Sequence, residues 1–134
     1  MNTRKRTRSR AFASAALMAF LGSSLCLSLA GCFDDDIKAL TIADPRPASV
    51  RDGVYVGSQD DAPISARVRV EVKSGRIDSI KVLKHSHGPG KGAEAIAGEV
   101  LAAQSLGVDA ISGATLSSKV MLKAIERALD QGLE

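Results

Sequence analysis

The feature that most constrains the fold of this chain is a strict alternation of apolar and charged residues over positions 66–73. The apolar positions are Ala66, Val68, Val70 and Val72, and the charged positions are Arg67, Arg69, Glu71 and Lys73. Successive side chains of a strand point to opposite faces of a sheet. The pattern therefore predicts a strand with one buried face and one solvated face.

The residues that follow predict a second strand, paired with the first in a hairpin over about residues 64–84. Ser74-Gly75 is a turn signal between the two strands. The separation of Ile77 and Ile80 is odd, so the alternation slips by one residue. One extra residue near positions 78–79 corrects the slip and predicts a β-bulge. The expected cross-strand pairs are Val72–Ile77, Val70–Ile80 and Val68–Val82.

The remaining elements complete an α+β fold. A short strand bounded by glycines is expected at about residues 53–57, and apolar residues recur with helical spacing over 91–104 and 116–131. Gly132 marks the end of the second helix. The buried stripe of that helix is expected to be Val120, Met121, Ala124, Ile125, Ala128 and Leu129. Strands followed by helices predict a small antiparallel sheet packed with two helices.

The N-terminal residues have the pattern of a secretory signal. Residues 1–10 contain five basic residues, and residues 11–33 carry no charge. The run Leu29-Ala30-Gly31-Cys32 resembles a bacterial lipobox, which implies cleavage before Cys32 and acylation of that residue. An uncleaved transmembrane anchor is the alternative, since the uncharged run is just long enough to span a bilayer. Both interpretations place the rest of the chain outside the cytoplasm.

This pattern predicts that the chain is divided into three parts. Residues 1–31 are expected to be the signal peptide, 32–50 an acylated Cys with a flexible tether, and 51–134 the folded domain. The tether is inferred from the acidic run 34–36 and the prolines Pro45 and Pro47. A location in the cell envelope is expected, at the outer membrane or a periplasm-facing membrane if the cell has two membranes.

The charge balance excludes some classes of partner. The whole chain holds 18 basic and 15 acidic residues, but residues 32–134 hold 13 basic and 15 acidic ones. The basic excess thus belongs to the signal and does not indicate a nucleic acid. With 3% aromatic residues and no Trp, the chain also lacks a stacking platform for single strands. Loss of Cys26 and acylation of Cys32 would remove thiol and Cys-metal chemistry.

The segment from Asp109 to Ser118 is a loop of small residues that leads into a helix. Gly113 permits unusual backbone dihedrals, and Ser112 or Thr115 can cap the helix. The N-terminus of a helix also favours an anion, because its N–H groups lack partners. On these grounds alone the segment is either a phosphate site or an ordinary capping loop.

The same segment resembles the flavinylation motif of the FMN-binding domain family, which reads Asp, two variable residues, Ser or Thr, Gly, Ala, Thr. The fixed positions are filled here by Asp109, Ser112, Gly113, Ala114 and Thr115. The family includes a periplasmic subunit of sodium-translocating NADH:quinone oxidoreductase and lipoproteins of extracellular electron transfer. The resemblance covers about residues 51–131. It implies covalent FMN, with its phosphate esterified to the Thr115 hydroxyl by a separate flavin transferase.

Two histidines, His85 and His87, follow the hairpin. Neither a Cys nor an evident carboxylate accompanies them, so no metal site is predicted. They are either exposed loop residues or, for His85, a contact to the flavin edge that supplies a proton.

Together these features predict a membrane-anchored extracytoplasmic flavoprotein that relays electrons in an envelope or extracellular chain. It is expected to be a carrier more than a complete oxidoreductase, because no dinucleotide fingerprint or haem motif is present. Its expected partners are the flavin transferase, the lipid bilayer through Cys32, and membrane or envelope redox proteins. The alternatives are a reversible FMN-binding module of a reductase and a non-redox lipoprotein interaction domain.

Overall fold

A computed structural model describes residues 32–86 and 91–133. The predicted signal peptide therefore lies outside the described residues. The elements in chain order are α1 (Cys32–Lys38), the 3-10 turn η1 (Pro47–Ser49), β1 (Gly53–Asp61), β2 (Ile64–Lys73), β3 (Arg76–Ser86), the 3-10 turn η2 (Lys91–Ala95), α2 (Ile96–Ala103) and α3 (Thr115–Asp130). No helix within those two ranges is long and apolar enough to cross a membrane.

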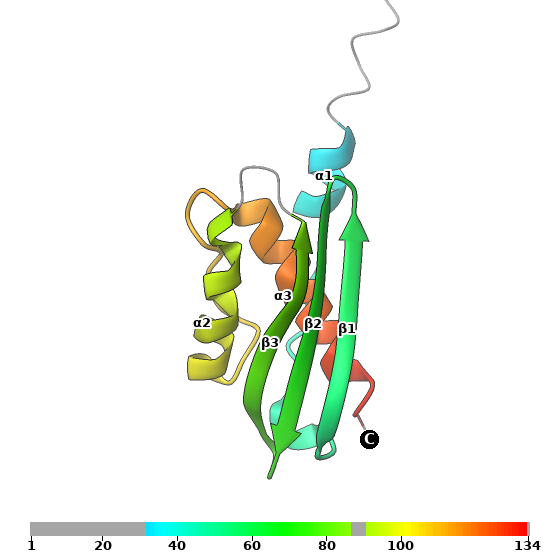
Figure 1. Cartoon of the computed structure of the whole chain (residues 1–134), viewed down its shortest axis with the longest axis vertical. Coiled ribbons are helices and arrows are strands. Elements are labelled where there is room, and N and C mark those ends of the chain that lie inside the picture. The colour runs from blue at the N-terminus through cyan, green and yellow to red at the C-terminus, as the bar shows by residue number, and fades with distance from the viewer. Residues whose placement is uncertain (1–31, 87–90, 134) are drawn as a thin grey trace, which may run out of the picture. The chain divides into compact units, whose positions relative to one another are not determined.

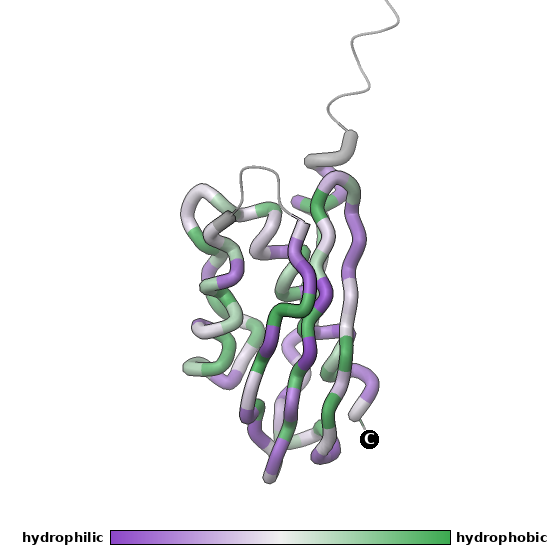
Figure 2. Tube along the Cα trace, viewed as in Figure 1, coloured by the Kyte–Doolittle hydropathy of each residue, from purple (hydrophilic) through white to green (hydrophobic). Residues whose placement is uncertain are grey.

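The strands form one antiparallel sheet in the order β1-β2-β3, and α2 and α3 pack against one of its faces (Figure 1). This arrangement confirms the predicted α+β class. The inward residues of β2 are Ala66, Val68, Val70 and Val72, and each is at most 2% exposed. The tube in Figure 2 shows the alternation of hydropathy along β2 that predicted this burial.

The predicted β-bulge is confirmed at Asp78, where Glu71 pairs with Ser79 and Val72 with Ile77. The cross-strand pairs Val70–Ile80 and Val68–Val82 are those expected. A second irregularity, which was not predicted, leaves Leu83 without a partner residue in β2. It reverses the alternation once more, so that residues after Leu83 on β3 change faces.

Helix α3 supplies most of the cover over β1 and β2. The predicted buried stripe of α3 is confirmed, because all six residues predicted for it are buried. At Gly57 of β1 the helix comes so close that a Cβ atom would lie 2.0 Å from the Ala124 carbonyl oxygen. At Gly132 a Cβ would lie 2.5 Å from the Tyr55 ring. Gly132 thus follows the helix for a packing reason, since only glycine leaves room for the tyrosine.

The first predicted helix begins differently from expectation. Residues 91–95 form a 3-10 turn, and the α-helix starts only at Ile96. Ala93 and Ile96 are both fully buried and lie three residues apart, a spacing that a 3-10 turn places on one side. The helix ends at Ala103, and the C-cap residue Gln104 adopts a left-handed backbone with φ of 55°.

The structure also differs from the expected tether over residues 37–50. Ile37 is 1% exposed and packs in the core, and α1 contacts α3. The Ala43 amide donates to the Glu126 carboxylate at 3.1 Å, and the Leu106 amide donates to Asp44 at 2.7 Å. The acidic and proline residues suggested an open chain, but the apolar residues between them gain burial against α3.

Candidate functional site

The motif segment lies where the connection from α2 reaches α3. Thr115 is the first residue of the helix and its side chain is exposed, whereas Ala114 before it is 6% exposed. Ser112 and Gly113 form the turn that precedes them and are also exposed. The helix therefore presents the Thr115 hydroxyl to solvent and anchors the loop beside it through a buried methyl group.

Three hydrogen bonds hold this turn in place. The Ala114 amide donates to the Ile111 carbonyl oxygen at 2.9 Å, and the Ser118 amide donates to the Ala114 carbonyl oxygen at 2.8 Å. The Ile111 amide donates to Ser118 Oγ at 3.1 Å, and Ser118 is fully buried. Gly113 has a φ of +76°, in the left-handed region that favours glycine. The backbone at Thr115 is thus fixed from both sides of the turn.

The expected capping role of Ser112 or Thr115 is wrong. The N-cap residue is Ala114, and no side chain caps α3. Thr115 is already the first helical residue, so it does not occupy the N-cap position. The first-turn N–H groups of α3 consequently receive no side-chain acceptor.

This arrangement fits a phosphate ester on Thr115. A phosphate on the hydroxyl would lie at the positive end of the helix dipole, where unpaired N–H groups can donate to its oxygens. A Cβ placed on Gly113 would have no atom within 4 Å, so the loop side of the site is open. The residues present therefore offer a hydroxyl oxygen to which the phosphate can be attached, and room beside it for a bulky group.

Asp109, the first residue of the motif, is exposed. Its carboxylate forms no hydrogen bond or ion pair with any residue in the described ranges. The loop is instead ordered by Ser118, which sequence reasoning missed. The available signal was its position three residues after Thr115, on the side of α3 that faces the core.

His85 is placed by the second irregularity of β3. It lies opposite Ala66, whose side chain points into the core, and the His85 side chain is 1% exposed. Its Nδ1 lies 3.5 Å from a carboxylate oxygen of Glu94 in η2. The expectation of an exposed loop histidine is therefore wrong for His85. Glu94 was also missed, because nothing in the sequence indicated that η2 would face the end of β3.

Strand β3 ends and helix α3 begins at the same end of the sheet (Figure 1), and η2 contacts α3 there. His85 and Thr115 thus share this end of the domain. His87, the other histidine singled out, lies outside the described residues. Within residues 32–86 and 91–133, no group of three or more His, Cys, Asp or Glu side chains is arranged to hold a metal ion.

Comparison with known proteins agrees with this geometry. The chain is 34% identical over 88 residues to an uncharacterized protein of Treponema pallidum (strain Nichols). That alignment covers 63% of this chain and 24% of the relative, so the chain spans about a quarter of the relative's length. The FMN-binding domain family matches residues 62–130, which include β2, β3, both long helices and the whole motif. The chain is a flavin-binding module and belongs to the FMN-binding domain family.

Proposed function

We propose that this protein is an electron carrier in which FMN is attached through its phosphate to Thr115. The observation that carries the proposal is the exposed Thr115 hydroxyl at the uncapped N-terminus of α3, within a fully matched motif. When bound, FMN supplies one- and two-electron redox chemistry. The domain itself then positions the phosphate and limits how far the flavin can move.

The attachment step follows from the chemistry of the residue. A threonine hydroxyl is a weak nucleophile, so a separate flavin transferase must activate it. With FAD as the donor, the Thr115 oxygen bonds to the phosphorus of the FMN half. The pyrophosphate bond breaks, AMP leaves, and the hydroxyl proton passes to a base of the transferase. The exposed Asp109 carboxylate lies on the same segment and is available to that enzyme.

A covalent bond also explains a weakness of the domain as a binding protein. From residue 51 onward Tyr55 is the single aromatic residue, so little is available to stack on a flavin ring. Its hydroxyl donates to the Arg51 carbonyl oxygen at 2.8 Å, and its ring packs beside Gly132. Tyr55 therefore lies beyond the C-terminal end of α3, about 24 Å of helix away from Thr115.

His85 is proposed to contact the flavin edge or supply a proton when the flavin is reduced. Its place at the same end of the sheet as Thr115 supports this role. The buried imidazole lies 3.5 Å from a carboxylate oxygen of Glu94, which fixes the ring at this end of the sheet.

We further propose that the protein is a lipoprotein of the cell envelope, anchored through acylated Cys32. The basic residues 4–10, the uncharged run and the lipobox-like residues 29–32 support this location. A donor in the membrane and an acceptor in the envelope would then exchange electrons with it.

The test is the intact mass of the protein after expression with and without a flavin transferase. The expected result is a mass increase of FMN less one water, present only with the transferase and absent in Thr115→Ala. Thr115→Ser is the matched control, because it keeps a hydroxyl and should keep the adduct. No adduct on the unaltered protein would contradict the proposal, and flavin retained by Thr115→Ala would indicate reversible binding instead.

A further inference from the structure

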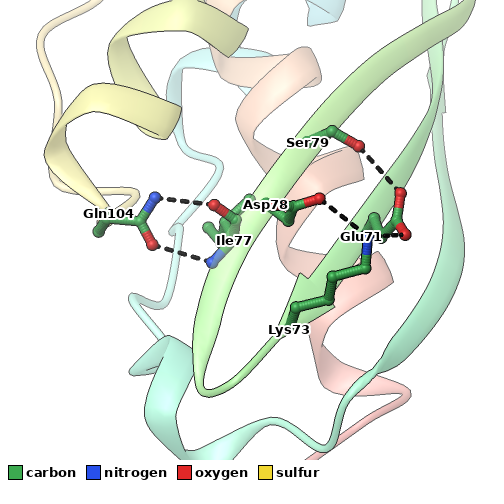
Figure 3. A network of polar contacts seen from close by, with 6 residues as sticks. All are labelled: Glu71, Lys73, Ile77, Asp78, Ser79 and Gln104. Carbon is green, nitrogen blue, oxygen red and sulfur yellow. Dashed lines mark hydrogen bonds and ion pairs between the residues drawn. The ribbon is translucent and has the colours of Figure 1, made fainter.

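The outer face of the sheet, opposite the helices, has two halves of different charge. Near the β2–β3 turn the charges neutralise one another, as Figure 3 shows. Lys73 lies 2.7 Å from Glu71 and 3.2 Å from Asp78, and Ser79 donates to Glu71 at 3.3 Å. This half of the face needs no partner to balance it.

The other half carries four exposed basic residues, which we call the basic face: Arg67, Arg69, Lys81 and Lys84. Arg69 lies directly opposite Lys81, and Arg67 directly opposite Lys84. Like charges in cross-strand pairs destabilise a sheet. None of the four forms an ion pair with a carboxylate of the described residues. An anionic partner bound to this face would offset the repulsion between the paired cations.

Three exposed apolar side chains lie on this face among polar ones such as Ser58, which pairs with Arg67. Val54 and Val56 on β1 are 46% and 38% exposed, and Leu83 at the second irregularity of β3 is 47% exposed. Asp60 is the one acidic side chain among the outward residues of β1, within a part of the chain that the structure describes throughout. Exposed apolar side chains among cations are typical of surfaces that rest on lipid headgroups.

Helix α1 lies at the same end of the sheet. A surface pocket beside the β1–β2 turn is lined by Asp36, Ile37, Asp60, Asp61 and Ala62. Arg67 and Lys84 pair a few residues beyond that turn. Four residues lie between Cys32 and the buried Ile37, and even a fully extended chain over those five steps spans about 18 Å. A lipid on Cys32 would thus hold this end of the sheet close to the bilayer.

We propose that the basic face is a docking surface for anionic phospholipid headgroups. The choice of a bilayer over another anionic partner rests on the lipid anchor proposed above. Docking would turn the outer face of the sheet toward the membrane and the opposite face, covered by α2 and α3, away from it. The anchor alone gives attachment, and the basic face adds a fixed orientation.

The test uses residues 33–134 without acylation or flavin, since residues 31–134 form one compact unit and the core lies within 37–133. Its binding to phosphatidylcholine vesicles with and without 40% phosphatidylglycerol is measured by flotation. Binding to the anionic vesicles is expected at 20 mM NaCl and should weaken strongly at 300 mM. Pure phosphatidylcholine vesicles should retain little protein.

Two charge-matched variants locate the surface. Arg69→Gln with Lys81→Gln should weaken binding at least tenfold. Arg46→Gln with Arg51→Gln removes two exposed cations at the other end of the sheet and should weaken it less than threefold. Circular dichroism melts check that both variants fold.

Two results would overturn the proposal. One is failure of the unaltered protein to bind anionic vesicles at low salt, which would leave an acidic protein as the partner. The other is equal loss of binding in the two variants. Because the assay contains neither flavin nor acyl chain, its outcome is independent of the Thr115 adduct.

Discussion

The buried hydroxyl of Ser118 accepts a hydrogen bond from the amide of Ile111 across the motif loop, at 3.1 Å. This contact joins the first turn of α3 to the second variable position of the motif. It therefore sets where the loop residues 112–114 lie relative to the Thr115 hydroxyl.

Ser118→Ala should destabilise the domain by about 1–3 kcal/mol, because it leaves the Ile111 amide without an acceptor in a half-buried place. Ser112→Ala is the control, since Ser112 is exposed and should change stability by about 0.5 kcal/mol or less. Urea unfolding followed by circular dichroism measures both. Equal stability of the two variants would mean that the Ser118 contact contributes nothing.

Gly57→Ala should destabilise the domain by about 3 kcal/mol. The new Cβ would meet the backbone of α3 at the Ala124 oxygen and at the Ala128 nitrogen, 2.6 Å away, and neither atom can rotate aside. Gly98→Ala is the matched substitution in α2, where a Cβ meets nothing within 4 Å. It should stabilise the helix by about 0.5–1 kcal/mol. Thermal melts that rank the two variants in the opposite order would contradict the packing described.

Gln104→Ala should leave the backbone of β3 at Ile77 without its hydrogen-bond partner at the edge of the sheet. The Gln104 amide accepts from the Ile77 amide at 2.8 Å and donates to the Ile77 carbonyl oxygen at 2.9 Å, so it replaces a neighbouring strand (Figure 3). Its loss should cost about 2 kcal/mol and speed hydrogen exchange at Ile77. Gln131→Ala, which removes an exposed contact to the Val56 carbonyl oxygen, should cost less than half as much. Unchanged exchange at Ile77 would show that water replaces the amide fully.

The pKa of Glu71 should lie below its ordinary value. The hydrogen bond from Lys73 is the main cause, and the positive charge of Lys73 adds to it. A lowered pKa stabilises the folded state above the ordinary pKa of about 4.3, and this contribution disappears as the pH falls through the folded value. In NMR titrations Lys73→Gln should return Glu71 to its ordinary range, whereas Arg76→Gln should leave it unchanged. The effect on stability should be small, because Lys73 is exposed and Glu71 is partly exposed.

The pKa of Lys73 shifts upward for the same reason. Hydrogen bonds to Glu71 and then Asp78 are its main causes. Glu71→Gln should therefore lower the Lys73 pKa toward its ordinary value, a reciprocal change that the same titration detects at alkaline pH. No change in the Lys73 pKa would contradict the contact.

The sequence by itself determined the β2–β3 hairpin, the inward residues of β2 and the bulge at Asp78, because alternation with period two leaves one register for the valines of β2. It also identified the motif and placed the start of α3 within one residue. These features are local, so they can be read from neighbouring positions along the chain.

Tertiary structure decided the rest. Sequence spacing did not indicate that Leu83 would turn His85 inward toward Glu94, because that shift depends on what packs against the end of β3. Nor did it show that Ile37 and Asp44 bind the folded domain, since an acidic, proline-containing segment favours an open chain until α3 offers a surface for burial. Likewise, Ser118 can accept the hydrogen bond from the Ile111 amide only because the fold places the first turn of α3 next to Ile111. In each case the deciding interaction joins residues whose proximity only the folded chain creates.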